Sequence, residues 1–157
     1  MRLILVQHGE AVDKTVDPER PLSPRGNLDV EGVALALARA SVAPQAIVHS
    51  GKTRAKQSAE IFQRVLDSKG RAAEITGIGP LDSVSKFAER TREMSADTLV
   101  CGHQPFMGRL VSQLLTGDQE VPLVTYSPGS AACLERNAGG SWTLVWFLRP
   151  ELCREPD

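Results

Sequence analysis

The sequence predicts an α/β fold, specifically a three-layer α/β/α sandwich with a mostly parallel sheet and a C-terminal antiparallel hairpin. Short apolar runs typical of buried strands alternate four times with segments of helical periodicity. Such alternation is typical of a parallel sheet covered by helices on both faces. The end of the chain differs, because two apolar segments there flank Asn137-Ala-Gly-Gly140, as in a hairpin. No repeat, low-complexity tract or linker divides residues 1–157, so we expect one domain.

The first half of the chain contains two strand and helix pairs. Leu3 to Val6 is a short apolar run, typical of a strand buried on both faces. Ser23-Pro24 marks a helix start, with serine as the N-cap and proline in the first turn, and the helix should run to about Ala40. We expect a second strand at Ala46 to His49 and a second helix from about Lys52 to Ser68.

The second half repeats this pattern. A third strand is expected at Ala73 to Thr76, followed by a helix around Val84 to Ala88 with Asp82 near its start as an N-cap. Thr98 to Cys101 predicts the fourth strand. Pro105 to Leu115 predicts a regular helix, because its apolar residues recur at helical spacing.

The last segments predict the hairpin and a loose terminus. Ser130 to Glu135 and Trp142 to Leu148 are the two apolar segments that would pair as antiparallel strands. Arg149 to Asp157 is polar and is expected to fray.

Composition and charge argue against several classes of protein. Lys and Arg number 18 and Asp and Glu number 19, so the formal charge is −1, without the basic excess of a nucleic-acid or anionic-membrane binder. The apolar runs are too short to span a bilayer, and no signal peptide is visible. The odd, widely spaced cysteines (Cys101, Cys133 and Cys153) indicate reduced thiols. We therefore expect a cytoplasmic protein without nucleic-acid or membrane partners; the sequence does not indicate an oligomeric state.

Polar residues gather where the predicted strands end. Ligands of open α/β sheets bind beyond the carboxyl ends of the strands. The first strand ends in Gln7-His8-Gly9-Glu10, and the fourth ends in Gly102-His103-Gln104-Pro105. After the second strand, Lys52 and Arg54 open the next helix. Two histidines and one arginine should therefore meet at one edge of the sheet.

This edge has the features of an anion site. Gly9 and Gly102 would let the backbone turn sharply and approach a ligand closely. Backbone N–H groups near Gln104 to Met107 would face the same crevice, because a helix starts there. The grouping suits a phosphate-like ligand.

Each residue taken alone also has a structural explanation. A histidine at a strand end often serves only as a hydrogen-bonding residue, and Arg54 by itself could be a solvated helix arginine. His49 has no partner pattern and is interpreted as structural. Glu10 is most simply part of a solvated loop. The argument for a site depends on the joint placement.

Four segments in order along the chain carry a family resemblance. They read Leu3-Ile-Leu-Val-Gln-His-Gly-Glu, Arg20-Pro-Leu-Ser-Pro-Arg-Gly, Ser50-Gly-Lys-Thr-Arg-Ala-Lys-Gln-Ser-Ala and Val100-Cys-Gly-His-Gln-Pro. Together they resemble the histidine phosphatase superfamily, most of all its SixA-type phosphohistidine phosphatase branch. The resemblance implies a phosphoglycerate mutase-like fold, with which the C-terminal hairpin agrees.

The resemblance also implies roles for the clustered residues. His8 matches the nucleophile, which forms a phosphoenzyme through a neutral ring nitrogen. His103 matches the histidine that contacts the transferring phosphoryl group, and Arg54 matches an arginine that binds it. The family requires no metal or other cofactor. Because the nucleophile must be unprotonated, activity should fall on acidification around pH 6–7, near the ordinary pKa of histidine.

One position departs from the family pattern. The family motif is Arg-His-Gly, whereas this chain has Gln7 before His8. Glutamine keeps an NH₂ donor but lacks the charge and the bidentate fork of arginine. A nearby cation could restore part of the lost charge, the candidates being Arg20, Lys52 and Lys14. We expect the substrate to be bound by four residues: Gln7, Gly9, Arg20 and Gln104.

The preferred hypothesis is a phosphatase that hydrolyses a phosphomonoester or phosphohistidine through phospho-His8. The chain between Arg54 and His103 leaves no room for additional segments over the pocket, so an open site could accept a phosphorylated protein or a small phosphate ester. Asp82 and Glu10 are candidates for a general acid. One alternative is a catalytically impaired protein of the same fold that binds phosphate or a phosphoprotein.

A second alternative is a metallohydrolase that uses His8, His49 and His103. Three histidines suffice in number for a zinc site, but no local metal-binding spacing occurs.

Overall fold

A computed structural model describes residues 1–69 and 71–156, and its strands and helices follow the predicted alternation. The strands are β1 (Arg2–Gln7), β2 (Ala46–His49), β3 (Ala73–Glu74), β4 (Thr98–Gly102), β5 (Ala131–Arg136) and β6 (Trp142–Leu148). The helices are α1 (Pro24–Arg39), α2 (Thr53–Val65), α3 (Val84–Thr91), α4 (Phe106–Thr116) and the short 3₁₀ helix η1 (Pro150–Leu152).

The strands form one mixed sheet in the order β3-β2-β4-β1-β5-β6. β1 pairs in parallel with β4, and β2 pairs in parallel with both β4 and β3. β5 pairs antiparallel with β1, and β6 pairs antiparallel with β5. The predicted α/β fold with a mostly parallel sheet and a C-terminal antiparallel hairpin is confirmed.

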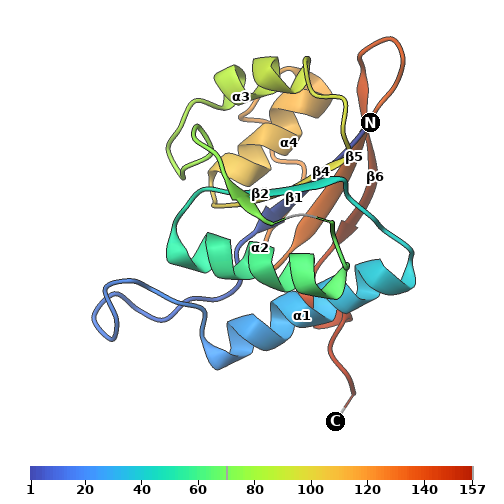
Figure 1. The fold of residues 1–157 in the computed structure, drawn as a ribbon. Helices are drawn as coiled ribbons and strands as arrows, with labels where there is room; N and C mark the ends of the chain where they lie inside the picture. The colour runs from blue at the N-terminus through green and yellow to red at the C-terminus, as the bar shows by residue number, and fades with distance from the viewer. Residues whose placement is uncertain (70, 157) are drawn as a thin grey trace.

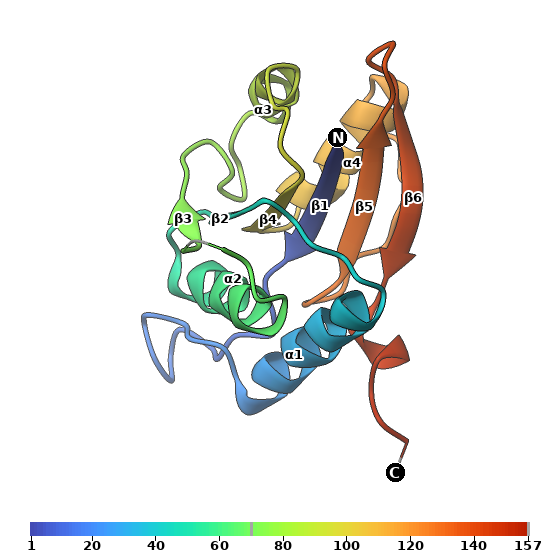
Figure 2. The same cartoon turned by 45° about the vertical axis from the view of Figure 1, so that its right-hand side comes forward.

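Helices cover both faces of this sheet, with α1 and α2 on one side and α3 and α4 on the other (Figures 1 and 2). Successive side chains of a strand point to opposite faces, and β1 supplies both cores in this way. Ile4 and Val6 are buried in the core beneath α1 and α2, whereas Leu3 and Leu5 are buried beneath α3 and α4. A strand that is apolar on both faces fits only in the middle of the sheet.

The start of α3 differs from the prediction. Ser83, not Asp82, is the N-cap, since its Oγ accepts the backbone N–H of Lys86. Asp82 stands one residue earlier, and its Oδ2 accepts the N–H of Gly79 at 2.7 Å within the preceding turn. The prediction of Asp82 as an N-cap was wrong because Ser83 is the residue that immediately precedes the first turn.

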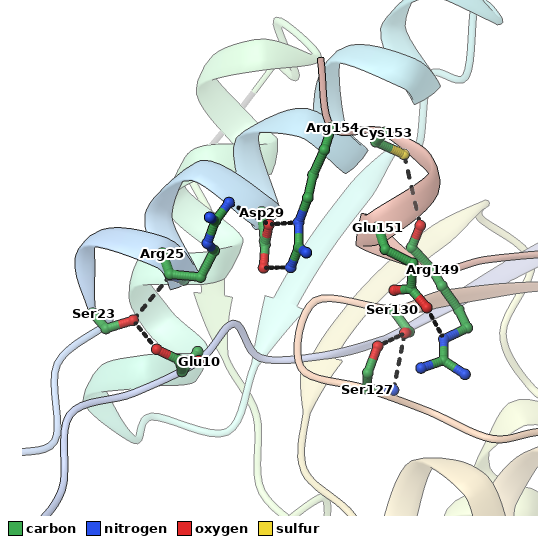
Figure 3. A network of polar contacts seen from close by, with 11 residues as sticks. Glu10, Ser23, Arg25, Asp29, Ser127, Ser130, Arg149, Glu151, Cys153 and Arg154 are labelled. Carbon is green, nitrogen blue, oxygen red and sulfur yellow. Dashed lines mark hydrogen bonds and ion pairs between the residues drawn. The ribbon is translucent and has the colours of Figure 1, made fainter. Parts of the chain in front are cut away.

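The C-terminal segment is ordered rather than frayed. After η1, the guanidinium of Arg154 donates from Nε and Nη2 to the two carboxylate oxygens of Asp29 at 3.0 and 2.9 Å (Figure 3). Asp29 lies on α1 and is buried. The expectation that the polar terminus frays was therefore wrong up to Arg154, because a buried carboxylate outside the segment holds it.

Within the described residues, no helix combines the length and hydropathy needed to cross a bilayer.

Candidate active site

The two histidines lie side by side because of the strand register. β1 and β4 pair in parallel with Gln7 opposite Gly102, so the next residue of each strand is a histidine. The backbone N–H of His8 donates to the carbonyl of Gly102 at 2.9 Å, and the ring centroids of His8 and His103 are 5.1 Å apart. The predicted convergence of the two histidines is confirmed.

The ring of His8 is fixed by a contact at each nitrogen. Nδ1 lies 2.7 Å from the carbonyl oxygen of Gly9. A carbonyl only accepts hydrogen bonds, so Nδ1 carries the proton and Nε2 keeps a lone pair. The guanidinium Nε of Arg54 donates to that lone pair at 3.3 Å. The nitrogen that is free to attack an electrophile thus faces the cationic side chain from α2.

Both histidines are neutral at pH 7. Burial lowers the pKa of His8 to about 4, and the charges of Arg54 and Arg20 act in the same direction, against the contact with Gly9. Burial lowers the pKa of His103 to about 3, with further lowering by His8, Arg54 and two other cations. A neutral imidazole is the form that can act as a nucleophile.

His103 is almost completely buried and is held by a serine from the adjacent strand end. Its Nε2 lies 2.6 Å from Oγ of Ser50, the residue after β2. Its Nδ1 is buried and has no hydrogen-bond partner among the described residues. A buried polar atom without a partner at a strand end marks a place where a ligand group could bind.

Arg54 and Arg20 make the site electropositive. Burial and the neighbouring charge of Arg20 lower the pKa of the Arg54 guanidinium. Arg20 has a left-handed backbone (φ 48°), and its Nε donates to the carbonyl of Val12 at 3.2 Å. An anion between the two guanidinium groups would relieve their mutual repulsion.

The contacts of Gly9 differ from those expected of a ligand-binding glycine. Its N–H donates to Oγ of Ser58 at 3.0 Å. A Cβ at Gly9 would lie 2.7 Å from Cγ2 of Val30 and 2.9 Å from the carbonyl of Gly26 on α1. The position excludes a side chain because the loop packs against α1.

Gln104 is turned back onto its own helix. Its Oε1 accepts the N–H of Gly108 at 2.8 Å, and the N–H of Met107 donates to the carbonyl of His103 at 2.9 Å. The expectation that the Met107 N–H is available to an anion was therefore wrong. Gln7 is different, because its buried Oε1 has no partner among the described residues.

The two carboxylates considered as acids are engaged in local contacts. Oε1 of Glu10 accepts the hydroxyl proton of Ser23 at the start of α1, as Figure 3 shows. Asp82 accepts the N–H of Gly79, as described above. These contacts stabilise local turns and helix starts, and they do not involve either histidine of the site.

The zinc hypothesis gains no support from the arrangement. His49 is buried, and its Nδ1 accepts the N–H of Gly51 at 3.0 Å, which agrees with its interpretation as structural. Across residues 1–69 and 71–156, no three His, Cys, Asp or Glu side chains are grouped as metal ligands.

Two serines of the site have no role assigned from the sequence, although both lie in the third segment of the family resemblance. Ser50 directly follows the second strand, and Ser58 lies four residues after Arg54, one helical turn along α2. The i, i+4 spacing from Arg54 was the available signal for Ser58. Its partner Gly9 lies 49 positions away, so the contact itself could not be read from the sequence.

Comparisons with known proteins agree with this geometry. No family model matches the chain. The phosphohistidine phosphatase SixA of Escherichia coli K12 is 29% identical over 155 residues, which covers 96% of this chain and 94% of that protein. A structure of the protein histidine phosphatase SixA complexed with tungstate is 26% identical with a TM-score of 0.84, and the match covers 98% of this chain and 100% of that one.

A more distant structure shares the fold. Phosphoserine phosphatase of Entamoeba histolytica, in complex with 3-phosphoglyceric acid, is 14% identical with a TM-score of 0.70, over 93% of this chain and 95% of that one. SixA matches nearly the whole chain in sequence and in structure. In this chain, two adjacent histidines lie at the ends of β1 and β4. The chain is homologous to the phosphohistidine phosphatase SixA over nearly its whole length.

Proposed function

We propose that this protein is a phosphatase that transfers a phosphoryl group from its substrate to Nε2 of His8 and then to water. The observation that carries the proposal is the state of His8. Its proton lies on Nδ1, its Nε2 lone pair faces Arg54, and a second neutral histidine lies beside it.

The reaction would proceed in two displacements. In the first, the Nε2 lone pair of His8 forms a bond to phosphorus while the bond from phosphorus to the leaving oxygen or nitrogen breaks. The leaving group takes the bonding electrons and a proton from solvent. In the second, water attacks the phosphorus of phospho-His8, the P–N bond breaks, and inorganic phosphate and neutral His8 are released.

The cationic surroundings would serve the transfer itself. Charge spreads over the equatorial oxygens of a transferring phosphoryl group, so pre-positioned cations and N–H donors stabilise it. Arg54 supplies such a charge at His8 Nε2, with Arg20 as its neighbour. We propose that Gln7 contributes an amide donor where an arginine would supply a full charge, and that His103 contacts the phosphoryl group.

We propose a phosphorylated protein, with phosphohistidine as its reacting residue, as the substrate. The support is the SixA homology, because that relative is a phosphohistidine phosphatase. A groove of about 600 Å³ beside Ser50 also runs along the segment between β3 and α3, lined by Lys52 and by residues 75–82. The groove adjoins the site through Ser50, which contacts His103, and offers room for a macromolecular substrate.

The test is direct detection of the intermediate. The protein is incubated with a low-molecular-weight phosphodonor and analysed by mass spectrometry under neutral conditions for an acid-labile phosphate on His8. His8→Ala should show no phosphate and at most a few per cent of wild-type turnover on an aryl phosphate. His49→Asn serves as the matched control and should be labelled at His8 as the wild type is.

Two outcomes would count against the proposal. Turnover by folded His8→Ala above a few per cent would exclude His8 as the nucleophile. Tight binding of phosphate or vanadate by the wild type, without labelling or turnover, would favour the phosphate-binding alternative.

A further inference from the structure

The hydroxyl of Ser58 joins two segments of the site. Ser58 lies on α2, one helical turn after Arg54, and is fully buried. Its Oγ donates to the carbonyl of Arg54 at 2.8 Å, a common contact for a serine within a helix. The same oxygen accepts the backbone N–H of Gly9 at 3.0 Å. This second bond connects α2 to the loop that follows β1.

Four hydrogen bonds close a circuit through this hydroxyl. His8 Nδ1 donates to the carbonyl of Gly9, and the N–H of Gly9 donates to Ser58. Ser58 in turn donates to the carbonyl of Arg54, and Nε of Arg54 donates to Nε2 of His8. Because a neutral imidazole has one donor and one acceptor, the circuit permits only the Nδ1–H tautomer of His8.

The Gly9 backbone is held from two sides. On one side it packs so closely against α1 that Val30 and Gly26 leave no room for a Cβ. On the other side, its N–H is bonded to Ser58. Without the hydroxyl, this buried N–H would lack a partner, so the loop would shift to restore one. A shift of Gly9 would also move the carbonyl that fixes Nδ1 of His8.

We propose that Ser58 is a positioning residue for phosphoryl transfer. Through Gly9 it holds His8 in the tautomer whose lone pair is on Nε2, and through the backbone of α2 it keeps Arg54 directed at that lone pair. The effect on turnover rests on the proposed phosphatase function, whereas the tautomer of His8 is a property of the ligand-free protein.

The test compares Ser58→Ala with Ser112→Ala. Ser112 is a matched control because it is a buried serine on α4 whose Oγ lies within hydrogen-bond distance of two carbonyls, that of Gly108 four residues earlier and that of Val121. Long-range ¹H–¹⁵N spectra of the free proteins report which ring nitrogen of His8 is protonated. Steady-state kinetics on an aryl phosphate give kcat and KM.

We expect Ser58→Ala to convert His8 to a mixture of tautomers and to lower kcat roughly 10–100-fold, the usual effect of removing a residue that orients a reactive group. KM should change less. Ser112→Ala should leave both the tautomer and kcat unchanged. If Ser58→Ala does not fold, Ser58→Cys replaces it, because a thiol is a weak acceptor for the Gly9 N–H.

The outcomes separate this inference from the proposed function. A folded Ser58 variant with the wild-type His8 tautomer overturns the positioning role, whatever its activity. A wild type that shows Nδ1–H His8 but no turnover contradicts the phosphatase function, while the tautomer comparison still decides the role of Ser58.

Discussion

The reactivity of His8 depends on where its single proton lies. The Gly9 carbonyl holds the proton on Nδ1, and burial together with the charges of Arg54 and Arg20 keeps a second proton away. His103 is neutral for similar reasons and stands beside it. The two neutral side chains therefore lie beside the cationic side chains of Arg54 and Arg20. This arrangement is suited to an attack by a neutral imidazole on an anionic substrate.

The lowered pKa values predict an unusual pH dependence. Since the pKa of His8 is lowered to about 4, the neutral imidazole persists below the ordinary range of histidine. Activity limited by His8 should be retained from pH 7 to about 5 and be lost towards pH 4, not around pH 6–7 as the unperturbed pKa implies. An NMR titration of the His8 ring in the free protein, alongside kcat/KM, measures this. A titration midpoint near the ordinary value would contradict the prediction.

Gln7 is the residue whose substitution should increase activity. Its Oε1 is buried without a partner among the described residues, in a strand-end position directly before His8. Gln7→Arg adds a charged bidentate donor, so kcat/KM on an aryl phosphate should rise about 10-fold and vanadate should bind more tightly.

Gln119→Arg is the control for added charge, because Gln119 follows the far end of α4. Loss of activity in Gln7→Arg would show that the neutral amide is required by the substrate.

At the scale of elements, the start of α1 fixes the loop that follows β1. Gly26 lies in the first turn of α1, and a Cβ there would collide with the backbone carbonyl of Glu10. Gly32, further along the same helix, has room for a methyl group, since its nearest neighbour would be Cβ of Cys153 at 3.5 Å.

Alanine substitution should therefore have opposite effects at these two glycines. Gly26→Ala should destabilise the protein by about 1–3 kcal/mol through overpacking and should reduce kcat, because Glu10 is two residues from His8. Gly32→Ala should be neutral or stabilise by up to about 1 kcal/mol through helix propensity. Urea unfolding and kcat measure both effects. Equal stability of the two variants would disprove the close approach of α1.

At the scale of the whole molecule, a buried carboxylate on α1 binds the C-terminal segment. Asp29 accepts two hydrogen bonds from Arg154, and Arg25 lies 3.9 Å from the same carboxylate (Figure 3). Since Asp29 is buried, loss of its bidentate partner leaves a poorly compensated charge.

Arg154→Ala should therefore lower Tm more than Arg25→Ala does, with kcat unchanged in both. The difference in Tm between the two variants should be smaller at high salt, because the side chain of Arg154 is half exposed and its ion pair is screened. Thermal unfolding at two salt concentrations measures this. If Arg154→Ala lowers Tm less than Arg25→Ala does, the C-terminal segment is held by the packing of η1 instead.

Local patterns in the amino-acid sequence are sufficient to predict the order and type of the elements from β1 to β6 and to single out the two histidines at the strand ends. Apolar runs such as Leu3 to Val6 and the helical stripe of α4 involve only neighbouring residues, so they require no tertiary information. Polar residues at the ends of parallel strands share one edge of the sheet, so this rule places His8 and His103 at the same edge. Their direct contact also requires that β1 and β4 be neighbours, which only the strand order of the sheet shows.

Contacts between segments distant in the chain depend instead on how the helices pack on the sheet. The contact at Nε2 of His8 depends on Arg54, the fixation of Gly9 depends on Ser58, and the order of the C-terminal segment depends on Asp29. Burial is the largest cause of the lowered pKa values of both histidines, and it exists only once the surrounding elements have packed around them. Such pairings carry no local periodicity, because they arise only when the packed elements bring the partners together.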